Sequence, residues 1–552
     1  MLTSAFTPSV TAVAGSLPLS ALFGLLPLLV FFVMLGVFKI PTHWCALGSL
    51  GVALLIAALG FRMPFGLALL SATQGAAFGI LVICFIVVAA VWLYNLSEAS
   101  GRGDDVRAIF SRVGKGDLRI QALLIATAFC ALMEGLAGFG APVAITCAML
   151  FALGLEPLKA ALVTMVANSI HVAFGAMAIP MITTARLGGA ETSLLTSTGA
   201  RITPLFLIWL PLVLLAMLDG KRAVKQLWPV GLVSGAGMAA GHFLTAHFVS
   251  YELTAVVGAL LSFALVALLL MFWSPSTPQD QLTTSQGESL GAGRALLALL
   301  PYWFVVLVFA TAKLWRIGFD LPAALKATDL KIPWPGLDGR LLTPAGEASG
   351  DTVLSISTLA SPGTMLVLAS LVVTIVYSVN SSGGRFPFSV SKGIATLGST
   401  VIGLRMAILT ITTVMALAYT MNFSGQTVAI GTALAATGTA FAFFAPILGW
   451  IGTAVTGSAT SAGALFASLH STVAAQTGLS PQLLLSVNEI GGGIGKIVSP
   501  QNLAIAATAV KQEGLEPELL RRAAPYSIGL VLLLSILTTL ASVGVLGFLI
   551  AS

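Results

Sequence analysis

A carboxylate lies next to several glycines and a proline in the middle of an apolar stretch. Glu134 is followed by Gly135, Gly138, Gly140 and Pro142, with apolar runs on both sides. Backbone broken by Gly and Pro is tolerated at membrane depth only where protein surrounds it or where it lines a wet cavity. An ionisable residue at that depth marks a functional site by default, here one that takes up and releases a proton. The alternative is a kinked helix with a permanently paired Glu134.

The composition indicates that this stretch lies within a membrane. Of the 552 residues, 57% are hydrophobic and 8% are charged, and the mean hydropathy is +1.01. The formal net charge is +6, but the basic residues lie in short loops, where they act as topology signals and not as a nucleic-acid surface. The four cysteines lack metal-ligand spacing. We therefore predict no nucleic-acid partner, no metal, no disulfide and no cofactor.

The apolar runs predict an all-α polytopic membrane protein with about twelve transmembrane helices, each run being about 20 residues long. A dense basic loop at 102–119 is assigned to the cytoplasm by the positive-inside rule. Three crossings before that loop place the N-terminus outside. The predicted spans are 19–38, 43–60, 75–94, 157–185, 203–218, 228–249, 252–274, 294–315, 364–380, 404–420, 480–511 and 524–550.

The segment around Glu134 is better explained as a hairpin than as a crossing. The two halves of 119–155 are each too short to span by themselves at 1.5 Å per residue. A re-entrant hairpin on the cytoplasmic side also keeps the later basic loops inside. We expect a first half at 1–274, with this hairpin followed by a broken helix at 157–185, and then a cytoplasmic linker at 275–293.

The second half, 294–552, is expected to contain the same two elements, a hairpin and a broken helix, with inverted orientation in the membrane. It contains a polar extracellular loop at 316–363, expected to be an ordinary solvated loop. An outward re-entrant hairpin at 441–477 has its small-residue tip near 456–463, and a broken helix follows at 480–511. The last span then leaves the C-terminus outside, on the same side as the N-terminus.

The two halves share a spacing. Asn168 and Pro180 are separated by twelve residues, as are Asn488 and Pro500, and the offset between the two pairs is 320 residues. The same offset aligns Gly138 with Ser458. With opposed hairpins this spacing predicts an inverted repeat, an architecture that places substrate and ion sites near the midplane between broken helices.

The motifs at these positions resemble the bacterial L-lactate permease family over nearly the whole chain. The matching stretches are Glu134-Gly-Leu-Ala-Gly-Phe-Gly-Ala-Pro-Val-Ala-Ile-Thr146, Val172-Ala-Phe-Gly-Ala-Met-Ala-Ile-Pro180, Leu448-Gly-Trp-Ile-Gly452, Thr456-Gly-Ser458 and Gly495-Lys-Ile-Val-Ser-Pro-Gln501. The chain departs from the family pattern at Ala459, His171 and Glu489.

The resemblance implies a proton symporter for lactate or glycolate in the bacterial inner membrane. Its partners would be a small carboxylate, the proton and the lipid bilayer. The family is grouped with ion transporters whose hairpins and broken helices move as an elevator-type unit, and the resemblance implies that mechanism here.

Two carboxylates are candidates for proton coupling, Glu134 and Glu489. Lys496 is the best cation for a carboxylate substrate, although a lysine near a span end can also snorkel to the surface. His171 is a candidate for bonding the substrate hydroxyl or relaying protons, and an interior structural histidine is the alternative. The predicted substrate-binding residues are Gly138, Phe139, Gly140, Asn168, His171, Thr456, Gly457, Ser458, Ser461, Asn488, Lys496, Ser499 and Gln501.

Other functions remain open at this level. A transporter of the same architecture with sodium coupling or another organic anion is the nearest alternative. An anion channel needs a continuous pore, which two opposed hairpins do not provide. An intramembrane enzyme is disfavoured, because the sequence contains no zinc motif, nucleophile elbow or aspartate pair.

Overall fold

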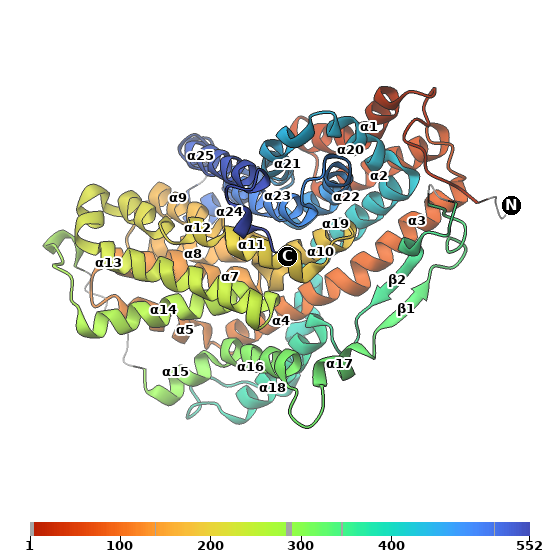
Figure 1. Cartoon of the computed structure of the whole chain (residues 1–552). Helices are drawn as coiled ribbons and strands as arrows, with labels where there is room; N and C mark the ends of the chain where they lie inside the picture. The colour runs from red at the N-terminus through yellow and green to blue at the C-terminus, as the bar shows by residue number, and fades with distance from the viewer. Residues whose placement is uncertain (1–4, 139, 283–289, 344–345, 513, 552) are drawn as a thin grey trace.

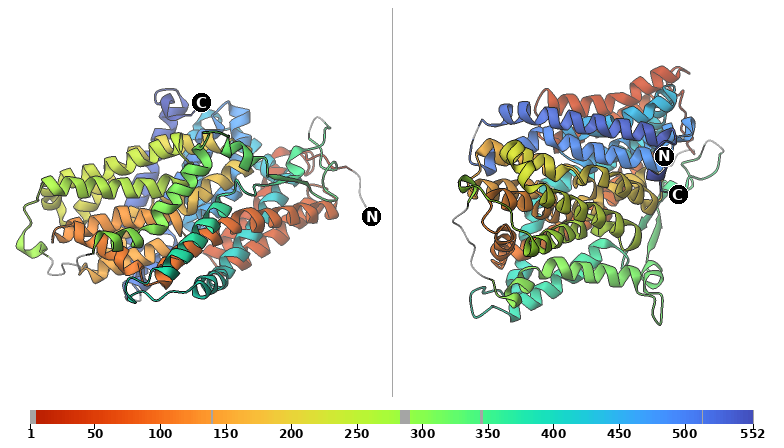
Figure 2. Two further views of the ribbon diagram at one scale, coloured as in Figure 1. Left: turned by 90° about the horizontal axis from the view of Figure 1, so that it is seen from below. Right: turned by 60° about the vertical axis from the view of Figure 1, so that its left-hand side comes forward.

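The protein is a bundle of helices, and the axes of most long helices are roughly aligned with one another (Figures 1 and 2). The computed structural model describes residues 5–138, 140–282, 290–343, 346–512 and 514–551. The helices before the linker are α1 (Leu17–Gly36), α2 (Thr42–Leu59), α3 (Phe65–Phe78), α4 (Phe85–Ala99), α5 (Gly103–Val113), α6 (Leu118–Leu124), α7 (Cys130–Leu136), α8 (Ala141–Ala152), α9 (Pro157–Asn168), α10 (Gly175–Leu187), α11 (Thr192–Ile202), α12 (Pro204–Leu207), α13 (Leu210–Phe248) and α14 (Thr254–Phe272).

The second part of the chain contains a similar number of helices and one small sheet. Its elements are α15 (Ala292–Ala298), α16 (Leu300–Leu314), α17 (Leu321–Lys326), β1 (Leu330–Pro333), β2 (Val353–Ile356), α18 (Pro362–Val379), α19 (Val390–Ser424), α20 (Gln426–Ala435), α21 (Phe441–Thr456), α22 (Ala459–Thr477), α23 (Pro481–Gly495), α24 (Pro500–Ala509) and α25 (Glu516–Ser542).

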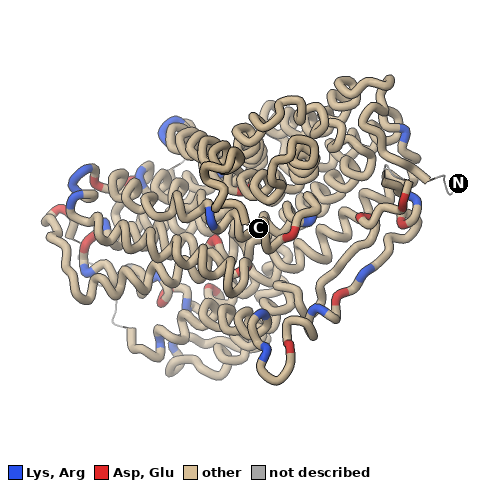
Figure 3. Tube along the Cα trace, viewed as in Figure 1, with Lys and Arg blue, Asp and Glu red and all other residues tan. Residues whose placement is uncertain are grey.

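Charged residues gather mainly toward the ends of the bundle, and long stretches of most helices carry none (Figure 3). In the described chain, ten helices are long and apolar enough to cross a membrane, and two bent pairs bring the number to twelve. The prediction of a polytopic all-α membrane protein with about twelve apolar helices is confirmed at this level. Two of the ten, Leu118–Leu136 and Gly438–Thr456, are segments that the sequence assigned to hairpins. The count alone therefore does not separate a crossing from a hairpin arm.

Several helices extend beyond the apolar runs that predicted them. The run 75–94 belongs to a continuous helix at Phe65–Ala99, and 404–420 belongs to the 35-residue α19. A hydropathy profile identifies only the apolar middle of such helices, because Ser, Thr, Gly and Lys near the helix ends lower the mean hydropathy there. The spans 203–218 and 228–249 lie along α11–α13, and α13 is kinked at Asp219 and Gly220.

The predicted basic loop is largely helical, and two of its basic residues, Arg107 and Arg119, form salt bridges. Arg119 is fully buried and bonds Asp117 at 2.8 Å and Asp219, at the α13 kink, at 3.1 Å. Arg222 bridges Asp219 to Asp280 in the described part of the linker 275–293. These bonds hold the linker against one end of the first half. Residues 283–289 of the linker lie outside the described residues.

The segment 316–363, expected to be an ordinary solvated loop, is largely exposed but contains regular secondary structure. This segment contains the short helix α17 and an antiparallel pair of strands, in which Leu330 faces Ile356 and Pro333 faces Val353. Both strands are only four residues long, so their alternation is too brief to be recognised in a polar segment of mixed composition.

The two helix–turn–helix units and the two broken helices pack together in the interior. The turn between α7 and α8 and the turn between α21 and α22 both face this region, and α10 packs against α22 and α23. Around it lie α13 and α14, then α1–α3 with α19 and α20, and then α15–α18 (Figure 1). The outer helices thus enclose the segments that carry most of the predicted site residues.

Both helix breaks lie near the positions that the 320-residue spacing indicates. α9 and α10 are bent by 60° at the first break. Ala176, Met177 and Ala178 have left-handed backbone angles there, so regular helix resumes only at Ile179. The second break separates α23 from α24, which begins at Pro500. The regular helices therefore resume at Ile179-Pro180 and at Ser499-Pro500, as the offset requires.

Gly491 lets α23 approach α21 closely, and its replacement by Ala is expected to destabilise the protein. A Cβ at Gly491 would lie 2.1 Å from the Pro446 carbonyl oxygen, so backbone must shift. Overpacking of this kind costs about 1–3 kcal/mol, and we expect a lower melting temperature in detergent. Gly529→Ala is the matched control, because no atom lies within 4 Å of its Cβ position. Equal melting temperatures for the two variants would contradict the close packing.

Candidate functional site

A cavity of about 350 Å³ lies where the two turns and the two helix breaks meet, beside α19 and the start of α2. On one side it is lined by residues of α19 between 403 and 411 and by Thr42 and His43. Nine predicted site residues line it: Glu134, Gly138, Gly140, Thr456, Gly457, Ser458, Ser461, Lys496 and Gln501. The tertiary structure thus brings together residues from both halves of the chain.

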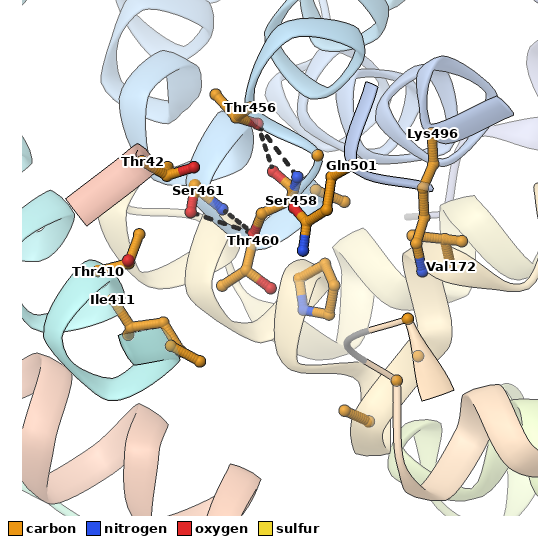
Figure 4. Close-up of a pocket in the computed structure, with 18 of the residues that line it drawn as sticks. Thr42, Val172, Thr410, Ile411, Thr456, Ser458, Thr460, Ser461, Lys496 and Gln501 are labelled. Carbon is orange, nitrogen blue, oxygen red and sulfur yellow. Dashed lines mark hydrogen bonds between the residues drawn. The ribbon is translucent and has the colours of Figure 1, made fainter. Parts of the chain in front are cut away.

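The charged feature of this cavity is an ion pair between Glu134 and Lys496. The Lys496 ammonium lies 3.3 Å from each carboxylate oxygen of Glu134. Both side chains are largely buried, with 7% and 3% of their surfaces exposed. In Figure 4 the Lys496 side chain extends from the break after α23 toward Val172. Because the pair also lines the cavity, a bound anion can compete with Glu134 for the same ammonium.

The first broken helix shapes the pocket around Glu134. Asn168, the last residue of α9, donates its side-chain amide to Glu134 Oε2 at 2.8 Å. A Cβ at Gly175 would lie 2.6 Å from Glu134 Oε1, so only glycine leaves room for the carboxylate. The left-handed residues that follow, at 176–178, are unusual for side chains other than glycine and asparagine. Such strain is characteristic of functional sites, where the surrounding structure holds it in place.

The second turn presents hydroxyl groups and a helix N-terminus. Ser458 caps α22 by accepting from the Ser461 amide at 3.2 Å, and the Ser461 hydroxyl lies 3.1 Å from the same oxygen. Thr456 donates to the Ser458 carbonyl at 3.1 Å across Gly457, which has φ 74°. Figure 4 shows this group on one side of the cavity. The capping serine leaves the other N-terminal amides of α22 available for a ligand.

A second helix N-terminus comes from α24. Ser499 caps it by accepting from the Asn502 amide, and Gln501 and Asn502 line the cavity. A Cβ at Gly457 would lie 2.3 Å from Gln501 Oε1, which shows how closely the turn and α24 approach. The N-terminus of α8 adds a third, since Gly140 is its N-cap. Three helix N-termini and one lysine make the cavity suitable for an anion.

Several predicted site residues do not line the cavity. Asn168 reaches it only through Glu134, and Ser499 acts as a cap. His171 lies apart, with its ring against His242 at a centroid distance of 5.4 Å. Asn488 points to Glu489, whose Oε1 it contacts at 3.3 Å. Phe139 lies outside the described residues.

Glu489 is buried away from Glu134. It accepts from Thr184 of α10 at 2.5 Å, and its second oxygen has no partner among the described residues. A Cβ at Gly463 would lie 1.9 Å from Glu489 Oε1, so α22 packs directly on the carboxylate. Glu489 therefore joins the two broken helices but does not contact the cavity.

The sequence reasoning missed five polar residues that line the cavity. Thr460 and Asn502 lie next to predicted residues, and their position at a helix N-terminus is a signal that could have identified them. Thr42 and His43 come from α2, and Thr410 comes from α19. None of the three is close in sequence to a helix break or to the turn of either hairpin. Only the packing of these helices against the interior places them at the site.

Comparison with known proteins identifies the family of the chain. The family model for L-lactate permease matches residues 20–545. The chain is 35% identical to the glycolate permease GlcA of Escherichia coli (strain K12), covering 97% of this chain and 98% of that protein. It is 34% identical to the L-lactate permease of Bacillus subtilis (strain 168), with the same coverage. It is 35% identical to the L-lactate permease of Escherichia coli (strain K12), covering 96% of each chain. With a family model and relatives that match nearly its whole length, the chain belongs to the L-lactate permease family.

Proposed function

We propose that the protein is a secondary transporter that carries lactate or glycolate together with a proton. The relatives named for these two acids support the substrate class. The observation that carries the proposal is the Glu134–Lys496 pair on the cavity wall. A buried cation that is already neutralised cannot accept a second carboxylate without leaving one negative charge uncompensated.

Protonation of Glu134 resolves this conflict. A protonated Glu134 releases Lys496, whose ammonium then binds the carboxylate of the substrate. The net charge of Glu134, Lys496 and any bound substrate is zero when the ion pair is alone. It is zero again when Glu134 is protonated and the substrate carboxylate is bound. The site is charged when only the proton or only the substrate is present, which is unfavourable in a largely buried site. Substrate and proton therefore bind and leave together, which gives one-to-one symport.

The neutral groups of the cavity suit the rest of a 2-hydroxy acid. The hydroxyls of Thr456, Ser458 and Ser461 and the amide of Gln501 can donate to or accept from the substrate hydroxyl. The glycines at the turns, Gly138, Gly140 and Gly457, allow backbone to approach the ligand, as is usual where a ligand lies against main chain.

Glu489 has a different role in this scheme. No Lys or Arg in the described chain pairs with it, and an isolated buried carboxylate is far more stable uncharged. We assign Glu489 a retained proton and a bridging function between α10 and α23. The side-chain amide of Asn488 donates to Glu489 Oε1 at 3.3 Å and helps to hold the carboxyl group in this position. Glu134, by contrast, has a cation whose release is coupled to its protonation.

The transport movement follows from the two opposed hairpins. We propose that α6–α8 and α21–α22 are re-entrant and that they move with the broken helices as an elevator-type unit. The turns of both hairpins line one cavity. Lys159, near the start of α9, bonds the Leu218 carbonyl close to the α13 kink, whereas Ser471 of α22 bonds the Gly188 carbonyl after α10. These contacts lie at opposite ends of α9–α10, which supports opposite entry of the two hairpins.

The bases of the hairpins provide a test of topology. We propose an inner-membrane location with both termini outside, which puts the base of the first hairpin in the cytoplasm and that of the second outside. Ala152→Cys is expected to react with an impermeant maleimide only from the cytoplasmic face, and Ala475→Cys only from the external face. Both positions are exposed. The bases are better targets than the turns, because both turns line the same cavity. Reaction of both cysteines from one face would contradict the inverted repeat.

Transport by the purified protein in proteoliposomes tests the function directly. Under an inward proton gradient we expect accumulation of L-lactate or glycolate, with D-lactate as a test of stereoselectivity. A matched sodium gradient without a pH gradient separates sodium coupling from proton coupling. Currents of single-channel size would instead indicate an anion channel. Absence of uptake of any of the three acids in correctly inserted protein would contradict the proposal.

A further inference from the structure

A second cavity, of about 310 Å³, lies at the far end of α10 from the break. Its wall combines the end of α10, residues 251 and 252, the end of α16, helix α17 and the segment between β2 and α18. Cavities of about 300–1,000 Å³ are typical of small-molecule sites. The basic residues that line it are Arg186, Lys313 and Lys326, and the acidic ones are Glu252 and Asp329.

The charges of this outer cavity do not cancel. Lys313 pairs with Glu252 at 3.0 Å, and Glu252 is 1% exposed. Asp329 accepts from Ser357 at 3.3 Å. In the chain as described, neither Arg186 nor Lys326 has a carboxylate within salt-bridge distance. With Lys313 and Glu252 neutralising each other, two cations remain against one carboxylate.

Arg186 is well placed to bind a carboxylate in this cavity. One of its nitrogens donates to the Ser355 carbonyl at 3.3 Å, and its guanidinium lies 5.6 Å from the centre of the Phe78 ring. These contacts orient the group but use only one of its donors among the described contacts. A guanidinium has five N–H donors in a planar fork that matches a carboxylate. The remaining donors are available to an anionic ligand.

The two cavities are connected through one helix. Ala176 and Pro180 of α10 line the central cavity, and Ile182 and Arg186 of the same helix line the outer one. From Pro180 to Arg186 the helix rises by about 9 Å, at 1.5 Å per residue. Thr184, between them, bonds Glu489. The two cavities are therefore lined by residues of one helix whose positions are about 9 Å apart along its axis.

We propose that the outer cavity is a second binding site for small carboxylates, occupied before the substrate reaches the central cavity. The inference rests on the proposed function only in that carboxylates are the transported class. A cationic, partly enclosed cavity raises the local concentration of anions and their rate of association. The site needs no conformational change of the hairpins to be filled.

Cysteine protection separates this site from the central one. Ala360 lines the outer cavity and makes no side-chain hydrogen bond, whereas the exposed Ala324 on α17 does not line it. In the reconstituted protein, L-lactate is expected to slow maleimide labelling of Ala360→Cys at least about twofold, as for half occupancy of one site, and to leave Ala324→Cys unchanged. Uncharged lactamide should not protect. The parent protein serves as the blank, since its four cysteines are buried.

Three further variants decide between a second site and an indirect effect. Protection of Ala360→Cys should persist when Glu134→Gln and Lys496→Gln remove the central pair, and it should be lost with Arg186→Gln. Lys326 is exposed, and its side chain makes no hydrogen bond or ion pair with the residues that the structure describes, so Lys326→Gln should weaken protection without affecting folding. Loss of protection with the central pair, or no protection in protein that still exchanges lactate, would overturn the second site and leave the proposed transport intact. Absence of all lactate transport would instead contradict the proposed function.

Discussion

Replacing Glu134 by Gln is expected to abolish proton-driven accumulation while exchange of substrate continues. Gln keeps the shape and much of the hydrogen bonding of a protonated Glu but cannot release a proton. Lys496 is then permanently free for the substrate carboxylate, so the carrier resembles the loaded state. Such a carrier moves substrate in both directions but cannot return empty without its proton. A pH difference of one unit is worth about 1.4 kcal/mol, or about tenfold in accumulation, and the variant should lose this factor.

The measurement is uptake of labelled lactate in proteoliposomes, with and without a pH gradient. Exchange at equal pH shows that the variant is folded and binds substrate. Glu489→Gln is the matched comparison, because Gln preserves an acceptor for Thr184 and Glu489 does not line the cavity. We expect it to accumulate lactate nearly as the parent does. If Glu134→Gln accumulates normally and Glu489→Gln does not, the roles of the two acids are reversed.

Replacing Lys496 by Gln is expected to weaken substrate binding by about 10- to 150-fold. This range corresponds to the loss of a hydrogen bond to a charged group, about 1.5–3 kcal/mol. The reason is that Lys496 is the one lysine or arginine that lines the cavity among the described residues. The half-saturation concentration for lactate exchange at equal pH measures the effect. A normal value would show that the ammonium does not contact substrate.

Two variants separate binding from folding. Lys496→Gln leaves Glu134 without its cation, and breaking a buried pair by removing one partner costs about 3–5 kcal/mol. Adding Glu134→Gln removes the unpaired charge, so the double variant should regain thermal stability but not affinity. Lys159→Gln controls for loss of a lysine elsewhere, since Lys159 bonds the Leu218 carbonyl and does not line the cavity. Recovery of affinity in the double variant would favour a purely structural role for Lys496.

The sequence by itself determined the class of protein and the segments that carry the site. Apolar runs indicate membrane helices through local composition alone. Gly and Pro mark the turns that contain Gly138, Gly140 and Gly457 and the breaks before Pro180 and Pro500, because these residues restrict or widen the backbone conformations at their own positions. The sequence also singled out Glu134 and Lys496, each with a structural alternative left open.

Only the tertiary structure decided what these residues do together. Glu134 and Lys496 are 362 residues apart in sequence, and nothing local indicates that they form a pair. Glu489 is a second case, because the sequence made it a candidate for proton coupling together with Glu134. The structure instead encloses it between α10, α22 and α23. Periodicity and propensity describe neighbours along the chain, whereas the charge balance of a buried site depends on which helices pack around it.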